Sequence, residues 1–223
     1  MKSDFTNNMT HELKTPVAVA YAANDAMLNF EVIKDREKTL KYLKISQEQL
    51  KRLSGLIEQI LSMSMERRKT MKLDIEEVDI LPVLQSLNAE EKLKADKPVE
   101  ISLDVPSKIT VKTDRLHFAH IMSNLLDNAI KYSADKAEIT VTAKQKDHKV
   151  EITVSDHGIG IDPDKQKYIF DKFYRVPHGN IQEVKGYGLG LYYVKNMMDK
   201  MQGSITVESE PGKGTAFKLI FNG

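Results

Sequence analysis

Residues 114–132 read DRLHFAHIMSNLLDNAIKY, and this stretch predicts one long amphipathic helix near the middle of the chain. Asp114 is a favourable N-cap residue because its carboxylate can accept hydrogen bonds from the first free N–H groups of a helix. The apolar face at helical spacing consists of Phe118, Met122, Leu125 and Ala129. This face predicts packing against a core.

A second face of the same helix is polar and carries Asn124, Asn128, Lys131 and Tyr132. Asparagine is a middling helix former, so this can be a simple solvated face. Alternatively, amide oxygens one turn apart can hold a hydrated magnesium ion and its phosphates, with Lys131 as a point charge. Both interpretations stay open for the helix taken alone.

Segments with strand periodicity flank this helix and alternate with further helices. We expect strands near residues 73–77, 99–105, 138–143, 149–155, 204–209 and 215–221, a helix over 81–95, and a helix that the glycine cluster 186–191 opens and that runs through Met198. Short turns separate consecutive strand pairs. The pattern therefore favours a mixed, mainly antiparallel sheet with helices layered on one face.

The sequence Asp156-His157-Gly158-Ile159-Gly160-Ile161 directly follows one of these strands. Two glycines after a strand-terminal aspartate allow a flat ring to approach the backbone, and the carboxylate can accept a hydrogen bond from an exocyclic amine. A tight turn with no ligand explains the same residues. These two interpretations are equally supported by the motif alone.

A second glycine cluster, Gly186-Tyr187-Gly188-Leu189-Gly190-Leu191, opens the last helix. Free amide donors and the positive end of the helix dipole at such a start can bind phosphate. The cluster is not a Walker loop, since no Gly-Lys-Ser/Thr ends it, and it lacks the spacing of the dinucleotide fingerprint.

Residues 169–175 before this cluster read IFDKFYR, and the polar stretch 176–185 that follows them predicts a mobile lid. We expect Phe170 and Phe173 to anchor the lid in the core and Arg175 to clamp transferring charge. Near the end of the chain, Gly212-Lys213-Gly214-Thr215 is more typical of a hairpin turn than of a ligand site.

The N-terminal third predicts two helices. A helical apolar stripe runs from Phe5 to about Asn29, and after a polar connection near 34–37 a second helix runs to about Met65. The second helix carries a coiled-coil repeat at Leu43, Leu50, Leu53, Ile57 and Ile60. Because a hairpin cannot bury both seams alone, we expect a four-helix bundle made by a symmetric dimer. Charged, aperiodic residues place a domain boundary near Lys69.

The first of these helices contains Met9-Thr10-His11-Glu12-Leu13-Lys14-Thr15-Pro16. His11 and Thr15 stand four apart and share a helix face, while Pro16 removes a donor and predicts a break below a reactive imidazole. A lone exposed histidine followed by a kink, without function, is an equally good interpretation of this segment by itself.

Composition narrows the class of protein. The net charge of +1 argues against nucleic acid as the main partner, and the absence of cysteine excludes disulfides and thiolate chemistry. No apolar run approaches the ~20 residues that span a bilayer, and the polar start is no signal peptide. We expect a cytoplasmic chain without direct membrane contact, which either stands alone or was cut from an inner-membrane sensor.

Taken in order, these motifs make the chain resemble the bacterial sensor histidine kinases of two-component signalling. The phosphoacceptor box corresponds to 11–16 and the asparagine box to 124–133. The remaining boxes correspond to 156–161, 170–175, 186–191 and 212–215. The resemblance implies an α-helical hairpin for dimerisation and phosphotransfer over 1–68. It also implies an α/β sandwich that binds ATP over 69–223.

The resemblance further implies roles for individual residues. Asp156 binds the adenine amine, Tyr132 lines the adenine or ribose region, and Asn128 coordinates magnesium with help from Asn124. Lys131 and Arg175 face phosphates. The remaining nucleotide contacts implied are Gly158, Gly160, Gly186, Gly188, Leu189, Gly190 and Thr215.

The implied chemistry is transfer of the γ-phosphoryl group of ATP to His11, oriented by Glu12, and then to an aspartate of a response-regulator receiver domain. Thr15 is implied to hold a water for regulator dephosphorylation. The related hydrolytic enzymes carry a glutamate where this chain has Asn124, and an amide cannot deprotonate water. Transfer is therefore favoured over hydrolysis.

Two other classes of protein compete with this interpretation. A gyrase-like conformational ATPase is disfavoured by Asn124 and by the hairpin around His11. A degenerate kinase that only scaffolds a regulator requires damaged motifs, and no motif of this chain is damaged.

Overall fold

The computed structural model describes residues 2–29, 32–67, 72–176 and 188–222, and for residues 2–12, 51–52 and 54–67 it describes the backbone alone. The chain divides into two compact units, Met1–Met71 and Lys72–Gly223. Each unit is treated by itself below.

The N-terminal unit is a hairpin of two long helices, α1 (Lys2–Asn29) and α2 (Arg36–Arg67), with a short 3-10 helix η1 (Val32–Lys34) between them. The helix α1 continues through Pro16, so the predicted break is wrong. Pro16 is buried together with Ala20 and Ala23, which lie on the same face of α1. Packing of this small-residue face offsets the lost backbone hydrogen bond.

The polar connection between the two helices is confirmed and carries the cap of α2. The Asp35 carboxylate accepts hydrogen bonds from the backbone N–H groups of Glu37 at 3.0 Å and Lys38 at 3.1 Å. The Thr39 hydroxyl donates to the carbonyl of Val32 at 2.8 Å and so ties η1 to the first turn of α2. The two bonds to Asp35 satisfy N–H groups that a helix start otherwise leaves unpaired.

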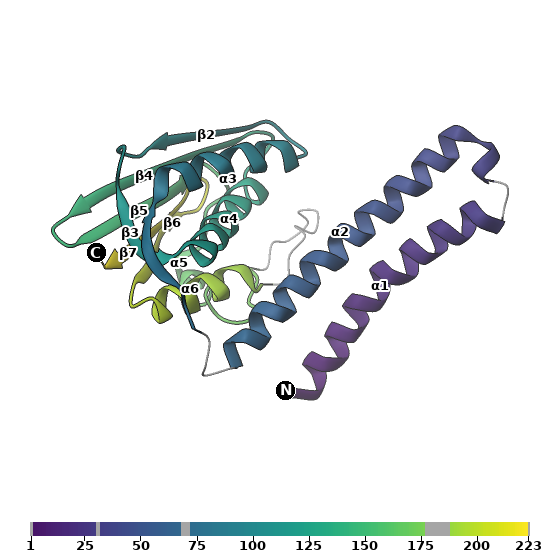
Figure 1. The fold of residues 1–223 in the computed structure, drawn as a ribbon, viewed down its shortest axis with the longest axis horizontal. Helices are drawn as coiled ribbons and strands as arrows, with labels where there is room; N and C mark the ends of the chain where they lie inside the picture. Colours follow the sequence, from purple (N-terminus) through teal and green to yellow (C-terminus); the bar gives the residue numbers. More distant parts are fainter. Residues whose placement is uncertain (1, 30–31, 68–71, 177–187, 223) are drawn as a thin grey trace. The chain divides into compact units, whose positions relative to one another are not determined.

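The C-terminal unit is built on a five-stranded sheet with the order β2-β4-β5-β7-β6 (Figure 1). Its strands are β2 (Val99–Asp104), β4 (Ala137–Lys146), β5 (Lys149–Asp156), β6 (Ser204–Glu210) and β7 (Gly214–Asn222). Only β2 and β4 pair in parallel, and the other three pairs are antiparallel. The predicted mixed, mainly antiparallel sheet is confirmed.

A separate two-stranded sheet joins β1 (Ile75–Asp79) to β3 (Thr110–Asp114). The strand β3 was not expected from the sequence. Its five residues begin with Thr110 and alternate exposed with buried side chains, and its partner lies more than thirty residues earlier in the chain. The sequence near it contains no hairpin turn that would have indicated the pairing.

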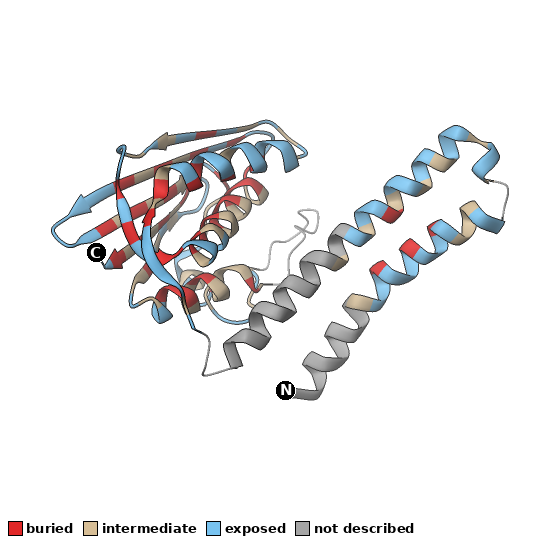
Figure 2. Cartoon of the chain, in the orientation of Figure 1, coloured by how far each residue is buried: buried red, intermediate tan, exposed pale blue. Residues whose placement is uncertain are grey.

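Helices α3 (Ile80–Lys94), α4 (Arg115–Lys131) and α6 (Gly190–Lys200) accompany the sheet, and α5 (Pro163–Gln166) is a single turn. The N-cap prediction for α4 is confirmed, since the Asp114 carboxylate accepts from the backbone N–H of His117 at 3.1 Å. The apolar face predicted for this helix is buried, as are alternate residues of the three central strands (Figure 2). The domain core therefore lies between α4 and one face of the sheet.

Among the described residues, no helix has an apolar stretch long enough to cross a membrane.

Candidate functional site

The C-terminal unit contains an open pocket of about 580 Å³ at the end of α4. Segments far apart in the sequence form it: the end of β5 and the residues after it, residues 169–176, the start of α6 and the start of β7. Its lining consists of Asn128, Tyr132, Asp156, Gly160, Ile161, Ile169, Tyr174, Arg175, Val176, Leu191, Thr215 and Phe217. Six of these residues were predicted from the sequence: Asn128, Tyr132, Asp156, Gly160, Arg175 and Thr215.

Asp156, the last residue of β5, is the carboxylate of this pocket. Its Oδ1 atom accepts hydrogen bonds from the backbone N–H groups of Gly158 at 2.8 Å and Thr215 at 3.2 Å. Burial raises the pKa of Asp156 above its ordinary value, and these two bonds oppose that shift. The Oδ2 atom has no hydrogen-bond partner among the described residues, so it can accept a donor from a ligand.

A serine that the sequence analysis missed supports this region from β6. The backbone N–H of Ile161 donates to the Ser209 hydroxyl at 2.8 Å, and that hydroxyl lies 2.9 Å from the hydroxyl of Thr215. The amide of Gln166 donates to the carbonyls of Ile161 at 2.9 Å and Ser209 at 2.8 Å. No spacing or motif marks Ser209 or Gln166 in the sequence, because the bonds that join Ser209 to Ile161 and to Gln166 link segments far apart in the chain.

The glycines allow close backbone approach at two places. At Gly160, where φ is +70°, a Cβ atom would lie 2.1 Å from the carbonyl oxygen of Glu210. At Gly190, the first residue of α6, a Cβ atom would lie 2.7 Å from Oδ1 of Asn124. A side chain at position 160 would clash with the backbone of Glu210, whereas one at position 190 would displace the Asn124 side chain.

The remaining residues of the two glycine clusters lie close to these contacts. Gly158 faces the carbonyl of Tyr132, and Gly188 approaches the carbonyl of Tyr174. Leu189 directly precedes α6, is 4% exposed and does not line the pocket. Gly186 lies outside the described residues.

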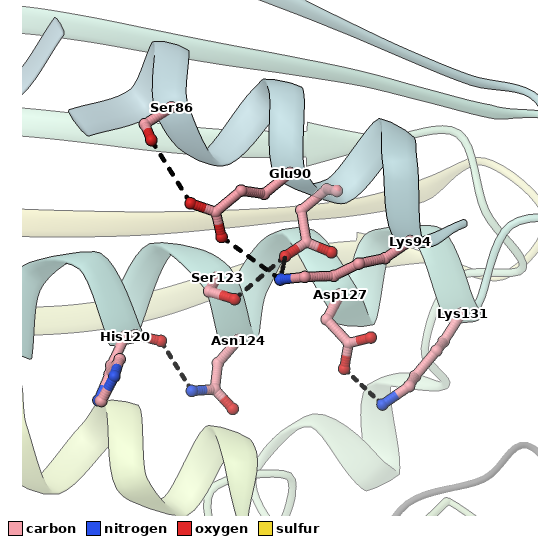
Figure 3. Close-up of polar contacts among 9 residues, drawn as sticks. Ser86, Glu90, Lys94, His120, Ser123, Asn124, Asp127 and Lys131 are labelled. Atoms are coloured by element: carbon pink, nitrogen blue, oxygen red, sulfur yellow. Dashed lines mark hydrogen bonds and ion pairs between the residues drawn. The ribbon is translucent and has the colours of Figure 1, made fainter. Parts of the chain in front are cut away.

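Only part of the polar face of α4 lines the pocket. Asn128 and Tyr132 line the pocket, whereas Asn124 and Lys131 do not. The Asn124 amide nitrogen donates to the carbonyl of His120 at 2.7 Å (Figure 3). Lys131 forms an ion pair with Asp127, one turn earlier on the same helix (Figure 3). A phosphate that binds Lys131 must therefore share this cation with Asp127.

The aromatic residues before α6 behave differently from one another. Phe170 packs edge to face against Phe217, with ring centroids 6.4 Å apart, which agrees with the predicted anchor. Phe173 is 43% exposed, so its predicted place in the core is wrong. Its backbone has a φ of 67° and its N–H donates to the carbonyl of Gly188 at 3.0 Å, a turn that directs the side chain to solvent. Residues 177–185 of the predicted lid lie outside the described part of the chain.

Known families match both units. Residues 1–68 match the family model described as the His Kinase A (phospho-acceptor) domain. Residues 113–222 match the one described as histidine kinase-, DNA gyrase B- and HSP90-like ATPase. The chain belongs to the sensor histidine kinases.

Individual relatives agree with this family. This chain is 34% identical over 222 residues to the sensor protein RprX of Bacteroides fragilis, a match that covers 97% of this chain and 43% of that protein. It is 30% identical over 218 residues to the signal transduction histidine-protein kinase ArlS of Staphylococcus haemolyticus, covering 97% of this chain and 48% of that protein. The chain thus spans less than half the length of these two curated relatives.

Solved structures show the same fold. The Acinetobacter baumannii histidine kinase AdeS matches with a TM-score of 0.70 at 23% identity, over 95% of this chain and 97% of that one. The histidine kinase ThkA, solved in complex with the response regulator TrrA, matches with a TM-score of 0.70 at 21% identity, over 98% of this chain and 61% of that one. A helical N-terminal region followed by an α/β domain is therefore the family fold.

The kinase pocket fits a magnesium ion that arrives with a nucleotide. Among the described residues no group of three or more His, Asp and Glu side chains is placed to hold a metal. Mg²⁺ usually takes one or two protein oxygens and completes its shell with water and substrate phosphates. The Asn128 amide, which lines the pocket, supplies an oxygen of this kind.

The predicted phosphoacceptor lies in the other unit of the kinase. The backbone of His11 and Glu12 is part of α1, and the side chains of both residues lie outside the described ones. Thr15, one turn after His11, is exposed. His11, Glu12 and Thr15 therefore lie on one continuous helix.

Proposed function

We propose that this chain is the catalytic core of a sensor histidine kinase, which transfers the γ-phosphoryl group of ATP to His11. From there the group passes to an aspartate of a response-regulator receiver domain. The observation that carries the proposal is the pocket that gathers Asn128, Tyr132, Asp156 and Thr215 in a chain whose first 68 residues match a phosphoacceptor domain.

We propose that the two parts of the chain have different roles. Residues 1–68 dimerise and carry the phosphoacceptor, and residues 69–223 bind the nucleotide. The exposed apolar side chains on the hairpin support a homodimer: Leu40, Leu43 and Leu50 of α2 are 50%, 48% and 55% exposed within one chain. A second copy would cover them in a four-helix bundle.

The adenine end of ATP belongs at Asp156. The exocyclic amine of adenine is a donor, and the Oδ2 atom of Asp156 is an acceptor with no other partner among the described residues. Ile161, Ile169 and Phe217 supply apolar walls on which a flat ring can stack. Tyr132, which lines the same pocket, is placed to meet the adenine or the ribose.

The phosphates belong toward the start of α6 and the end of α4. The N-terminal end of a helix favours negative charge, and Leu191 in the first turn of α6 lines the pocket. Arg175 lines the pocket, and Lys131 would join it by sharing its bond to Asp127. Asn128 would hold magnesium with help from Asn124, and the bound ion would neutralise charge on the group in transfer.

In the transfer step a lone pair of the neutral His11 imidazole forms the new N–P bond. The bond between the γ-phosphorus and the bridging oxygen breaks, and ADP leaves with that electron pair. Glu12 orients the ring and accepts its other proton. Asn124 carries no base that could activate water, so transfer to His11 is favoured over hydrolysis.

We also propose dephosphorylation of the regulator as a second activity of the same hairpin. Thr15 is exposed one turn beyond His11 on α1, where its hydroxyl can orient a water toward a docked regulator. A cytoplasmic location follows from the proposed use of ATP and a regulator.

Incubation with γ-labelled ATP and magnesium tests the proposal. The unchanged chain should acquire label that acid removes and alkali does not, His11→Gln should abolish it with ATP affinity retained, and Asn128→Ala should abolish both labelling and magnesium-dependent binding. Acid-stable label on His11→Gln would instead indicate a serine or threonine kinase. Steady phosphate release without phosphoprotein would indicate a conformational ATPase.

A further inference from the structure

A hydrogen bond joins α4 to α6 close to the proposed phosphate end of the pocket. The His117 Nδ1 atom lies 2.7 Å from the Tyr193 hydroxyl, and the two residues are 76 positions apart in the chain. The Tyr193 ring centroid lies 6.3 Å from that of His117 and 6.4 Å from that of His120. The two histidines share one face of α4, so a single tyrosine of α6 contacts both.

Neighbouring residues on both helices link this contact to the proposed site. The carbonyl of His120 accepts the hydrogen bond from the Asn124 amide nitrogen, which leaves Oδ1 of Asn124 directed at the start of α6 (Figure 3). There, Gly190 lies so close that a Cβ atom would be 2.7 Å from that oxygen. Gly190 stands one turn before Tyr193, so both contacts between the helices lie on the same face of α6.

We propose that Tyr193 and His117 are positioning residues, which set the distance between α4 and α6 and thereby hold Asn124 and the first turn of α6 in register for the triphosphate. The inference rests on the proposed function and extends it to two residues outside the family motifs. Neither side chain lines the pocket.

Apolar packing alone would define this distance poorly. The buried face of α6 consists of Val194, Met197 and Met198, and methionine side chains adapt to small shifts of a helix. A hydrogen bond of 2.7 Å has a narrow range of lengths and angles. The bond therefore supplies the geometric precision that the flexible packing lacks.

The charged and titratable groups around His117 favour a neutral pair. Burial lowers the pKa of His117, as do His120 on α4 and Lys200 on α6, while Asp114 raises it. Burial raises the pKa of Tyr193. At neutral pH the bond therefore joins an uncharged imidazole to an uncharged hydroxyl.

The test is Tyr193→Phe in the full chain, with equilibrium binding of adenosine and of ATP with magnesium as the readout. Loss of one net hydrogen bond predicts that ATP affinity falls about 3- to 10-fold. Adenosine, which is held at the Asp156 end, should bind within about twofold of the unchanged chain. Tyr168→Phe, at a residue 43% exposed, is the matched control and should change neither affinity.

Variants of the partner complete the test. His117→Leu should reproduce the loss of ATP affinity, His117→Gln should recover part of it by offering an acceptor to Tyr193, and the double variant His117→Leu/Tyr193→Phe should be no worse than either single one. An unchanged ratio of ATP to adenosine affinity in Tyr193→Phe would overturn the inference, whether both affinities are retained or both fall by the same factor. If the unchanged chain binds neither ligand, the proposed function itself fails.

Discussion

The two carboxylate oxygens of Asp156 have different surroundings. One carboxylate oxygen accepts two backbone N–H groups and holds the turn at Gly158 against the start of β7. The other oxygen is the one that we propose accepts the adenine amine. Because burial raises the pKa of this carboxyl group while the two bonds oppose the shift, its acceptor role depends on the turn that it stabilises.

At this scale we predict the outcome of Asp156→Asn. The amide oxygen can still accept from Gly158 and Thr215, so the fold should persist, but the amide nitrogen would face the amine of adenine as a second donor. Mismatched donors of this kind cost about 1–3 kcal/mol, so ATP affinity should fall about 10- to 100-fold. Calorimetric titration measures the affinity, and a melting temperature close to that of the unchanged chain shows that the fold is intact. Undiminished ATP binding would contradict the assigned role of Asp156.

At the scale of elements, α4 is held from two sides. Tyr193 of α6 contacts one side, and on the other side Glu91 of α3 accepts a hydrogen bond from the Ser123 hydroxyl at 3.2 Å. Glu91 is 5% exposed and also accepts from Lys94 at 3.3 Å. A carboxylate so deeply buried is stable only when its partners are in place. The helix that carries both asparagines is therefore fixed by polar contacts as well as by its apolar face.

We expect Glu91→Ala to destabilise the C-terminal unit by about 1–3 kcal/mol, since it leaves the Ser123 hydroxyl without its acceptor in a tight interface. Glu90→Ala is the matched control. Glu90 lies one residue earlier, its side chain is 53% exposed, and it contacts Ser86 and Lys94 at the surface (Figure 3). Its loss should cost less than about 0.5 kcal/mol. Urea unfolding followed by circular dichroism measures the free energy of unfolding of both variants. Equal losses would show that the buried contact of Glu91 stabilises the unit no more than the surface contacts of Glu90.

At the scale of the whole molecule, the hairpin differs from the C-terminal unit in what it leaves uncovered. The C-terminal unit buries a core of large apolar residues between α4 and the sheet, and its exposed ones, such as Ile75, Leu93 and Leu116, lie outside that core. On the hairpin, Val17, Tyr21, Leu43 and Leu50 are each at least 40% exposed. Helical hairpins with such a seam need another layer to bury it, which the proposed dimer supplies.

We predict that Leu50→Glu converts a dimer of this chain into monomers. A glutamate in the centre of the seam would be buried without a partner, a cost of several kcal/mol that should raise the dimer dissociation constant by at least about 100-fold. Leu93→Glu, at an 87% exposed position of α3, should leave the dimer intact. Sedimentation equilibrium measures both. A monomeric unchanged chain, or a Leu50→Glu variant that stays dimeric, would exclude the seam as the interface.

Much of the fold followed from local patterns. The helix over 114–132, its cap at Asp114, the two N-terminal helices and the mixed sheet were all predicted and are confirmed. The break at Pro16 and the burial of Phe173 were wrong, because contacts made elsewhere in the fold overrode the local preference of each residue. The roles of the individual site residues stay predictions that the experiments above address.

By itself the sequence determined the elements and the motif residues, because helical and strand periodicity, caps and glycine positions are encoded in neighbouring residues. Only the tertiary structure decided that six of the predicted residues line one pocket, that Ser209 and Gln166 support it, and that Tyr193 reaches His117. These contacts join residues tens of positions apart, and no local spacing records them. They depend on the packing of one whole element against another, which exists only in the folded chain.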